Sequence, residues 1–145
     1  MKIYLDMCCL KRPFDDQTDP RIRLEAMATE TVLQSCRDGE HDLITSDALR
    51  FENGRNPNPT RQQYAADMLG LAKLDVPHSV GIETRAAAWQ SVGMPLLDSL
   101  HLASAEAIGA DIFATCDDVL LNRASRLPSN VRIVGLLVLL TEMMP

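Results

Sequence analysis

The chain has 145 residues, a length that suits one domain and that can bury enough surface to fold without a disulfide or a metal staple. Hydrophobic residues make up 46% and charged residues 23%, which excludes a disordered or collagen-like chain. The net charge of −6 argues against a general basic surface of the kind that holds duplex DNA by electrostatic attraction.

Short apolar segments alternate with longer helical patterns along the whole chain. The predicted strands cover residues 2–5, 42–45, 74–77, 111–115 and 131–134. The first predicted helix begins at Asp19-Pro20 and is closed by Gly39, and a second, short helix is capped by Ser46 and stops before Asn56. A Thr60/Gln63 capping box begins the third helix. Four more helices are predicted over 79–90, 95–109, 118–125 and from 136 onward. No hairpin signal joins the strands. This pattern predicts one domain over residues 1–145, a three-layer α/β/α fold with a central, mostly parallel sheet of four or five short strands.

The sequence predicts neither a membrane span nor a signal peptide. Asp6 interrupts the apolar start of the chain too early for a signal peptide, and the apolar run over 131–140 is far shorter than the ~20 residues that a span requires. We therefore expect a soluble, cytoplasmic protein. Its four cysteines form no C-x-x-C pair, so in a reducing compartment we expect free and mostly buried thiols.

Acidic residues recur where predicted strands end and the next helices begin. Asp6 and Asp117 each follow a strand, and Asp98 lies in the first turns of the helix that begins at Pro95. The carboxyl ends of parallel strands line the ligand crevice of such sheets. A helix cap or a turn explains each acid taken alone, but caps do not explain three acids at equivalent strand ends. Converging carboxylates repel each other unless a cation neutralises them, and oxygen-only ligands favour Mg²⁺ or Mn²⁺.

Three segments carry a family resemblance: I-Y-L-D-M-C-C-L at the N-terminus, P-L-L-D-S-L-H-L-A-S-A from Pro95 to Ala105, and F-A-T-C-D-D-V-L-L from Phe113 to Leu121. They are similar to the PIN-domain ribonucleases, and more specifically to the VapC-type toxins of bacterial toxin–antitoxin pairs, and the likeness covers nearly the whole chain. The resemblance implies a PIN-like fold and a set of site residues. The implied catalytic residues are Asp6, Glu52, Asp98 and Asp117; the implied metal ligands are Asp6, Asp98 and Asp117; and Thr115 is implied at the substrate site, where its hydroxyl orients Asp117 or a metal-bound water.

The resemblance also implies an activity and partners. The activity is hydrolysis of RNA phosphodiester bonds by a Mg²⁺- or Mn²⁺-dependent endoribonuclease. The implied partner is a small cognate antitoxin protein, with a homodimer left open. One or two divalent ions would bind the scissile phosphate and activate the attacking water, because the chain has no Ser/His or Cys/His nucleophile arrangement.

Some assignments within this pattern remain alternatives. Asp47 rivals Glu52 as the acid of the short second helix, but Ser46 and Asp47 suit a cap and a first turn, and Glu52 lies further along. Many relatives have Asn or Ser where this chain has Cys8. His101, three residues after Asp98, is either a second contact to the site or a packed histidine bonded to a backbone carbonyl, and the latter is the more common case.

Cationic residues near the acids are candidates for holding RNA phosphates. They follow the first acidic loop or surround the Glu52 helix: Lys11, Arg12, Arg50, Arg55 and Arg61. Arg12 is the strongest candidate for substrate binding, since its loop leaves the strand that ends at Asp6. Each of these residues is equally well explained as a solvated surface charge.

Two other functions compete with a nuclease. A phosphoacceptor receiver domain needs a second acid beside Asp6 and a lysine near the last strands, and no lysine follows Lys73. The alternative that remains is a catalytically inactive PIN-like module that binds or scaffolds a partner. Retention of all four acids argues against that alternative, because buried carboxylates without a cation are costly.

Overall fold

The computed structural model describes residues 1–144, which form a five-stranded sheet with all strands parallel in the order β3-β2-β1-β4-β5. The strands are β1 (Lys2–Leu5), β2 (Asp42–Ser46), β3 (Leu74–Val76), β4 (Ile112–Thr115) and β5 (Arg132–Gly135). The central strand β1 lies between β2 and β4, so the chain builds the sheet outward on one side of β1 and then on the other. The predicted three-layer α/β fold and its parallel sheet are confirmed.

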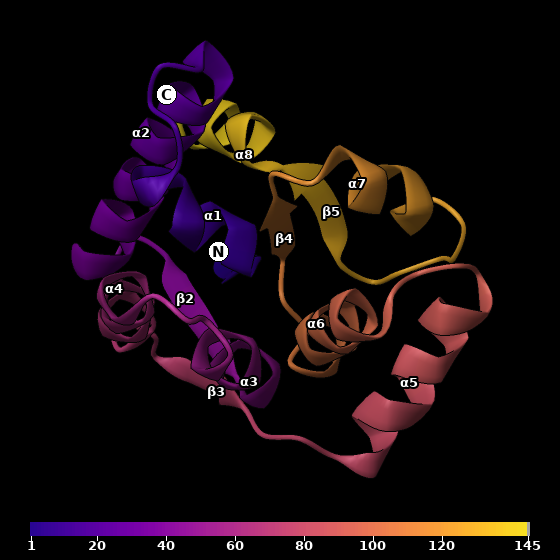
Figure 1. The fold of residues 1–145 in the computed structure, drawn as a ribbon. Helices are drawn as coiled ribbons and strands as arrows, with labels where there is room; N and C mark the ends of the chain where they lie inside the picture. The colour runs from indigo at the N-terminus through magenta and orange to yellow at the C-terminus, as the bar shows by residue number, and fades with distance from the viewer. Residues whose placement is uncertain (145) are drawn as a thin grey trace.

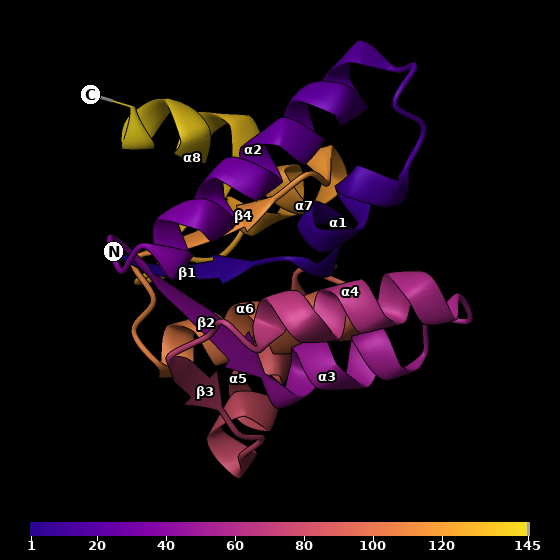
Figure 2. The ribbon, with the colours of Figure 1, turned by 90° about the vertical axis from the view of Figure 1, so that its left-hand side faces the viewer.

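Helices cover both faces of the sheet. They are α1 (Met7–Lys11), α2 (Pro20–Arg37), α3 (Asp47–Gly54), α4 (Pro59–Leu69), α5 (Val80–Ser91), α6 (Leu96–Ala107), α7 (Asp118–Ala124) and α8 (Leu136–Met143). Figure 1 shows α2 and α8 on one side of the sheet and the pair α5 and α6 on the other. Figure 2 shows α1, α3 and α4 gathered beyond the carboxyl ends of β1 and β2. The helices of residues 1–144 are all too short or too polar to cross a membrane.

The helix starts follow their capping residues. The Asp19 side chain accepts hydrogen bonds from the backbone of the first turn of α2, and Pro20 occupies the first helical position. The Ser46 hydroxyl accepts from the Leu49 N–H and so begins α3 directly at the end of β2. Gly39 adopts a φ of 79°, which lets the chain turn from α2 into β2.

Two local features differ from the sequence prediction. Helix α1 and the 3₁₀ turn over Arg12–Phe14 were not predicted, because a single turn is too short to show a helical period. The proposed Thr60/Gln63 capping box is wrong. Helix α4 begins at Pro59, since the Asn58 side chain accepts hydrogen bonds from the Thr60 and Arg61 N–H groups.

The register of β1 against β4 places the site. Leu5 is paired with Ala114, and both are fully buried, so the next residues of the two strands, Asp6 and Thr115, emerge side by side at the carboxyl edge. Below this edge Tyr4 stacks on Phe113, with ring centroids 5.3 Å apart. The apolar core thus supports a polar site at the point where the strand order reverses, which is where ligands bind in open α/β sheets.

Candidate active site

A buried carboxylate lies at the centre of the site. Asp6 directly follows β1, and its Oδ1 accepts a hydrogen bond of 2.8 Å from the Met7 N–H, which caps α1. Its Oδ2 accepts a bond of 2.7 Å from the Thr115 hydroxyl, and that hydroxyl also accepts from the Asp117 N–H at 3.1 Å. The fully buried Thr115 therefore fixes Asp6 relative to the start of α7, and its predicted role of orienting the Asp117 side chain or a metal-bound water stays a prediction.

Helices α3 and α6 bring a second carboxylate to Asp6. Glu52 Oε1 lies 2.7 Å from His101 Nε2, and the ligand atoms of Asp6, Glu52 and His101 all lie within 4.8 Å of one another. The other ring nitrogen of His101 lies 2.6 Å from the Tyr4 hydroxyl, which in turn lies 2.7 Å from Ser46 Oγ. The sequence analysis left His101 out of the site; in the structure it is fully buried and bonded to a phenol and a carboxylate. Its spacing from Asp98 was the one signal that pointed to it.

The two remaining predicted acids, Asp98 and Asp117, lie at the starts of helices α6 and α7. Asp98 lies in the first turn of α6, and its pKa responds to the charges of Asp6, Asp117 and Glu52. Asp117 caps α7, and its Oδ1 accepts from the Val119 and Leu120 N–H groups. Asp117 is therefore both a helix cap and a neighbour of the acidic site. The structure brings Asp6 and Glu52 together, and Asp98 lies near enough to feel the charges of Asp6, Glu52 and Asp117; the catalytic roles of the four acids stay a prediction.

Asp47, the rival to Glu52, and Asp118, the neighbour of Asp117, lie outside this cluster. Asp47 pairs with Arg50 at 2.6 Å and accepts a hydrogen bond from the His78 N–H. Asp118 pairs with Arg21 on the surface at 2.7 Å. Each carboxylate already has a cationic partner, so neither resembles the uncompensated acids around Asp6.

Burial and mutual repulsion disfavour the ionised acids. Burial is the main reason that the pKa of Asp6 rises to about 7; the charges of Cys8 and Glu52 add to the effect, and the charge of His101 and the Thr115 hydrogen bond oppose it. Burial also raises the pKa of Asp98 to about 6, helped by the charges of Asp6 and Asp117. The positive charge of His101 favours the ionised forms of both carboxylates, but burial and the neighbouring negative charges outweigh it.

The Glu52–His101 pair behaves differently. Burial alone would raise the pKa of Glu52, but the hydrogen bond and positive charge of His101, with Lys11 nearby, lower it below its usual range. Burial alone would lower the pKa of His101, but the bond to Glu52 and the charges of Asp6 and Asp98 raise it. The pair therefore keeps Glu52 ionised and gives the site one buried cation. One histidine does not balance four carboxylates, and this oxygen-rich donor set fits a hard divalent cation.

The cationic residues around the site are mostly paired. Arg12 donates to Asp15 at 2.9 Å and to Glu25 at 3.1 Å, and Arg61 donates to the Phe14 carbonyl at 2.6 Å. Arg50 bonds Asp47 and Asp75, and the Arg55 guanidinium lies over the Phe51 ring.

Lys11 lies 3.8 Å from Glu52, with 40% of its side chain exposed. Among the described residues, Lys11 is thus better placed than Arg12 to meet a phosphate at the acidic site.

Solved structures of low sequence identity share this fold. A chain of FitAcB from Neisseria gonorrhoeae has a TM-score of 0.56 and 16% identity, over 93% of this chain and 98% of its own. A chain of VapBC2 from Rickettsia felis, bound to a DNA fragment from their promoter, has a TM-score of 0.55 and 14% identity, over 93% and 98%. A chain of DNA-bound VapBC from Salmonella typhimurium has a TM-score of 0.56 and 13% identity, over 94% and 98%.

The chain has a VapC-like PIN fold. The resemblance stated from the sequence is therefore confirmed at the level of the fold, along nearly the full length of the chain. No family model and no curated protein matches the sequence. Because the identities are low, the residues of the site must be judged by their own geometry.

Replacement of Asp98 by Asn should stabilise the protein in the absence of divalent metal. The unfolded chain releases this proton near pH 4 and the folded chain at about 6, so the folded state loses stability as the pH rises through this interval. At pH 8 the variant should gain on the order of 1 kcal/mol after solvent screening, or about 2–4 °C in Tm, and at pH 4 the gain should vanish. Thermal melts at both pH values measure this difference.

Asp118→Asn is the matched control, because Asp118 also lies in the first turn of a helix but pairs with Arg21 outside the cluster. It should not gain stability at pH 8. Added Mg²⁺ should raise the Tm of the parent more than that of Asp98→Asn. An Asp98→Asn protein that melts well below the parent at pH 8 would show that Asp98 serves the fold through the helix dipole.

Proposed function

We propose that the chain is a divalent-metal-dependent endoribonuclease over residues 1–145, the toxin of a type II toxin–antitoxin pair. The observation that carries this proposal is the convergence of Asp6, Glu52 and His101 within 4.8 Å at the carboxyl edge of the sheet, with Asp98 and Asp117 electrostatically coupled to them. Asp6 is buried and the other acids are partly buried, and His101 and Lys11 do not balance four carboxylates, an arrangement that is costly to a fold that only scaffolds a partner. A site that binds a cation accounts for that cost.

The four acids divide into metal ligands and one proton acceptor in this proposal. Asp6, Asp98 and Asp117 would hold Mg²⁺ or Mn²⁺; they lie at the end of β1 and at the starts of α6 and α7, and Asp98 feels the charges of the other two. When bound, the cation supplies charge stabilisation at the phosphate and lowers the pKa of water. Thr115 holds Asp6 Oδ2 by its hydrogen bond and so sets the direction from which this carboxylate meets the cation.

Glu52 is the proton acceptor of the proposed reaction. Its Oε1 is bound to His101, so its Oε2 is the atom that accepts a proton from the attacking water. The low pKa of Glu52 keeps this carboxylate ionised at neutral pH. The bonds from Tyr4 and Ser46 hold the His101 ring, and through it Glu52, in one orientation.

The substrate and partner assignments rest on the fold and on charge. Lys11 lies beside Glu52 and is proposed to meet an RNA phosphate. Arg12 stays a candidate for the same role, but its guanidinium must first release its hydrogen bond to Asp15 or to Glu25 before it can bind the phosphate. A small antitoxin is the proposed protein partner because the fold is shared with chains of VapBC and FitAcB. A homodimer remains an open prediction.

Cleavage of a single-stranded RNA should stop in excess EDTA and return with Mg²⁺ or Mn²⁺. The physical reason is that the donor set is oxygen-rich and the acids repel each other without a cation. Gel analysis of a labelled unstructured RNA, with protein freed of co-purified partner, gives the measurement. Undiminished cleavage in excess EDTA would remove the metal-dependent mechanism.

Replacement of Glu52 by Gln should lower turnover by about 10² or more, the scale typical of one acid–base group. The amide oxygen still accepts the bond from His101, but the charge is lost; because the lowered pKa of Glu52 means that the ionised carboxylate stabilises the folded state, the melting temperature at neutral pH should fall, so rates are compared at a temperature where both variants are folded. Asp47→Asn on the same helix is the control and should leave cleavage unchanged, since Asp47 is exposed and bonded to Arg50 and the His78 N–H. Single-turnover cleavage rates of both variants decide between them; a larger loss in Asp47→Asn would refute the role of Glu52.

A further inference from the structure

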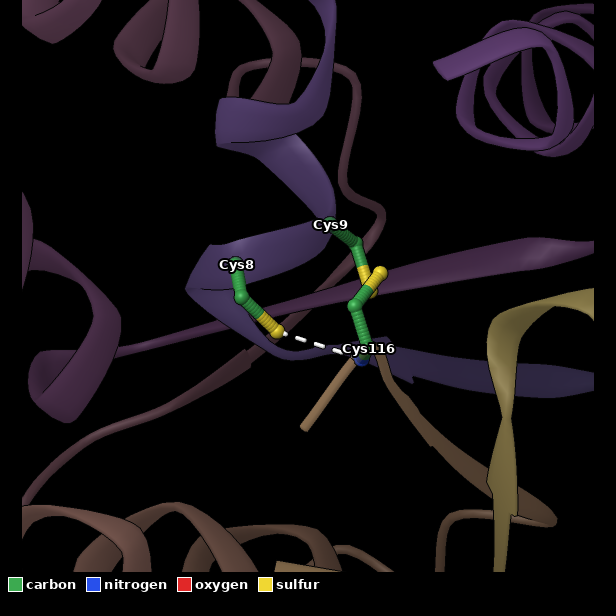
Figure 3. A group of neighbouring side chains, drawn as sticks. All are labelled: Cys8, Cys9 and Cys116. Carbon is green, nitrogen blue, oxygen red and sulfur yellow. Dashed lines mark hydrogen bonds between the residues drawn. The ribbon is translucent and has the colours of Figure 1, made fainter. Parts of the chain in front are cut away.

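Three of the four cysteines bring their sulfur atoms to one point that the proposed phosphodiester chemistry does not use. Cys8 and Cys9 lie in α1, and Cys116 directly follows β4, more than 100 positions later in the chain (Figure 3). The three Sγ atoms lie within 4.8 Å of one another. Cys36, the fourth cysteine, lies in α2 and is not part of this group.

The spacing of the sulfurs matches the coordination of a metal ion. At a metal–sulfur distance of about 2.3 Å, two sulfurs on one ion lie about 3.8–4.0 Å apart. Cys9 Sγ and Cys116 Sγ are already 3.8 Å apart, and both residues are buried. Cys8 needs a shift of at most about 1 Å to complete the triangle. Its side chain is partly exposed, so it can move and gives an ion its route of entry.

The surroundings of Cys8 also suit a ligand sulfur. Figure 3 shows the Cys116 backbone N–H directed at Cys8 Sγ, a hydrogen bond of 3.2 Å. The Thr115 hydroxyl lies 3.3 Å from the same sulfur. Hydrogen bonds that neighbouring groups make to a ligand atom hold that ligand in place and favour its negative charge. An all-sulfur donor set selects soft ions over Mg²⁺, so this group and the acidic cluster prefer different metals.

We propose that Cys8, Cys9 and Cys116 form a binding site for a thiophilic d¹⁰ cation, Zn²⁺ or Cu⁺. The site touches the acidic cluster at one contact, because Cys8 Sγ lies 3.3 Å from Asp6 Oδ2. An ion held by Cys8 therefore lies next to the carboxylate at the centre of the acidic site. The proposal rests on the sulfur geometry alone and does not depend on nuclease activity.

Titration with Cd²⁺ tests the site, because cadmium thiolates have an ultraviolet charge-transfer band that carboxylate complexes lack. The protein is kept reduced with a phosphine, and excess Mg²⁺ is present to occupy the oxygen ligands. We expect a band that saturates at one Cd²⁺ per chain. Displacement of the bound Cd²⁺ by Zn²⁺ or by Cu⁺ then shows which of the two the site holds more tightly.

Single substitutions assign the band to its ligands. Cys116→Ser and Cys8→Ser should each weaken Cd²⁺ binding by more than about 100-fold, beyond the 10–100-fold that loss of an outer contact costs. Cys36→Ser is the control and should bind like the parent. Circular dichroism and melts of the metal-free variants verify folding; if the buried Cys116 variant does not fold, the partly exposed Cys8 variant decides the result.

Two results would overturn the proposal: no saturable band in the reduced parent protein, or equal bands in the parent and in Cys8→Ser. Asp98→Asn separates this test from the proposed nuclease, because it should leave the band intact while RNA cleavage is lost. A band without nuclease activity would support the sulfur site and count only against the proposed function. Nuclease activity without a band would support the proposed function and count only against the sulfur site.

Discussion

The constraint on which the site depends is one buried carboxylate, Asp6, with further, partly buried carboxylates around it. Asp6 is buried at the end of the central strand, and burial is the main reason that its pKa rises to about 7. The parallel sheet causes this, because every strand ends at the same edge and the apolar residues before each acid pack into the core. Thr115 and the start of α1 satisfy both Asp6 oxygens, so the fold tolerates the acid by hydrogen bonds although its charge is not balanced.

His101 shows how the fold partly offsets this charge. Its ring links Tyr4 in the central strand to Glu52 in α3, and the three elements β1, α3 and α6 are thereby joined through one hydrogen-bonded chain. The chain keeps Glu52 ionised while Asp6 and Asp98 are pushed toward protonation. Titratable groups whose environments separate their pKa values in this way are typical of sites with divided acid–base roles.

Much of this arrangement could be predicted from the sequence, because strand periodicity and caps such as Asp19 and Ser46 are local signals. The placement of Asp6, Asp98 and Asp117 at one edge followed from the parallel topology. What could not be predicted depends on packing between distant segments. The Glu52–His101 bond requires α3 to lie against α6, and the pairing of Arg12 with Glu25 requires the unpredicted turn after α1. Helix α1, which was not predicted either, brings Cys8 and Cys9 to Cys116.

The central claim is that the acidic cluster binds a divalent cation. Calorimetric titration of the metal-free protein with Mn²⁺ tests it most directly, with Asp6→Asn as the matched variant. Asn keeps the volume of Asp6. Its amide oxygen can still accept from the Met7 N–H and its NH2 group can donate to the Thr115 hydroxyl, so the substitution removes mainly the charge. The account predicts saturable, stoichiometric binding to the parent that is lost in Asp6→Asn. The absence of saturable binding to the parent, or the same binding in both proteins, would contradict the account.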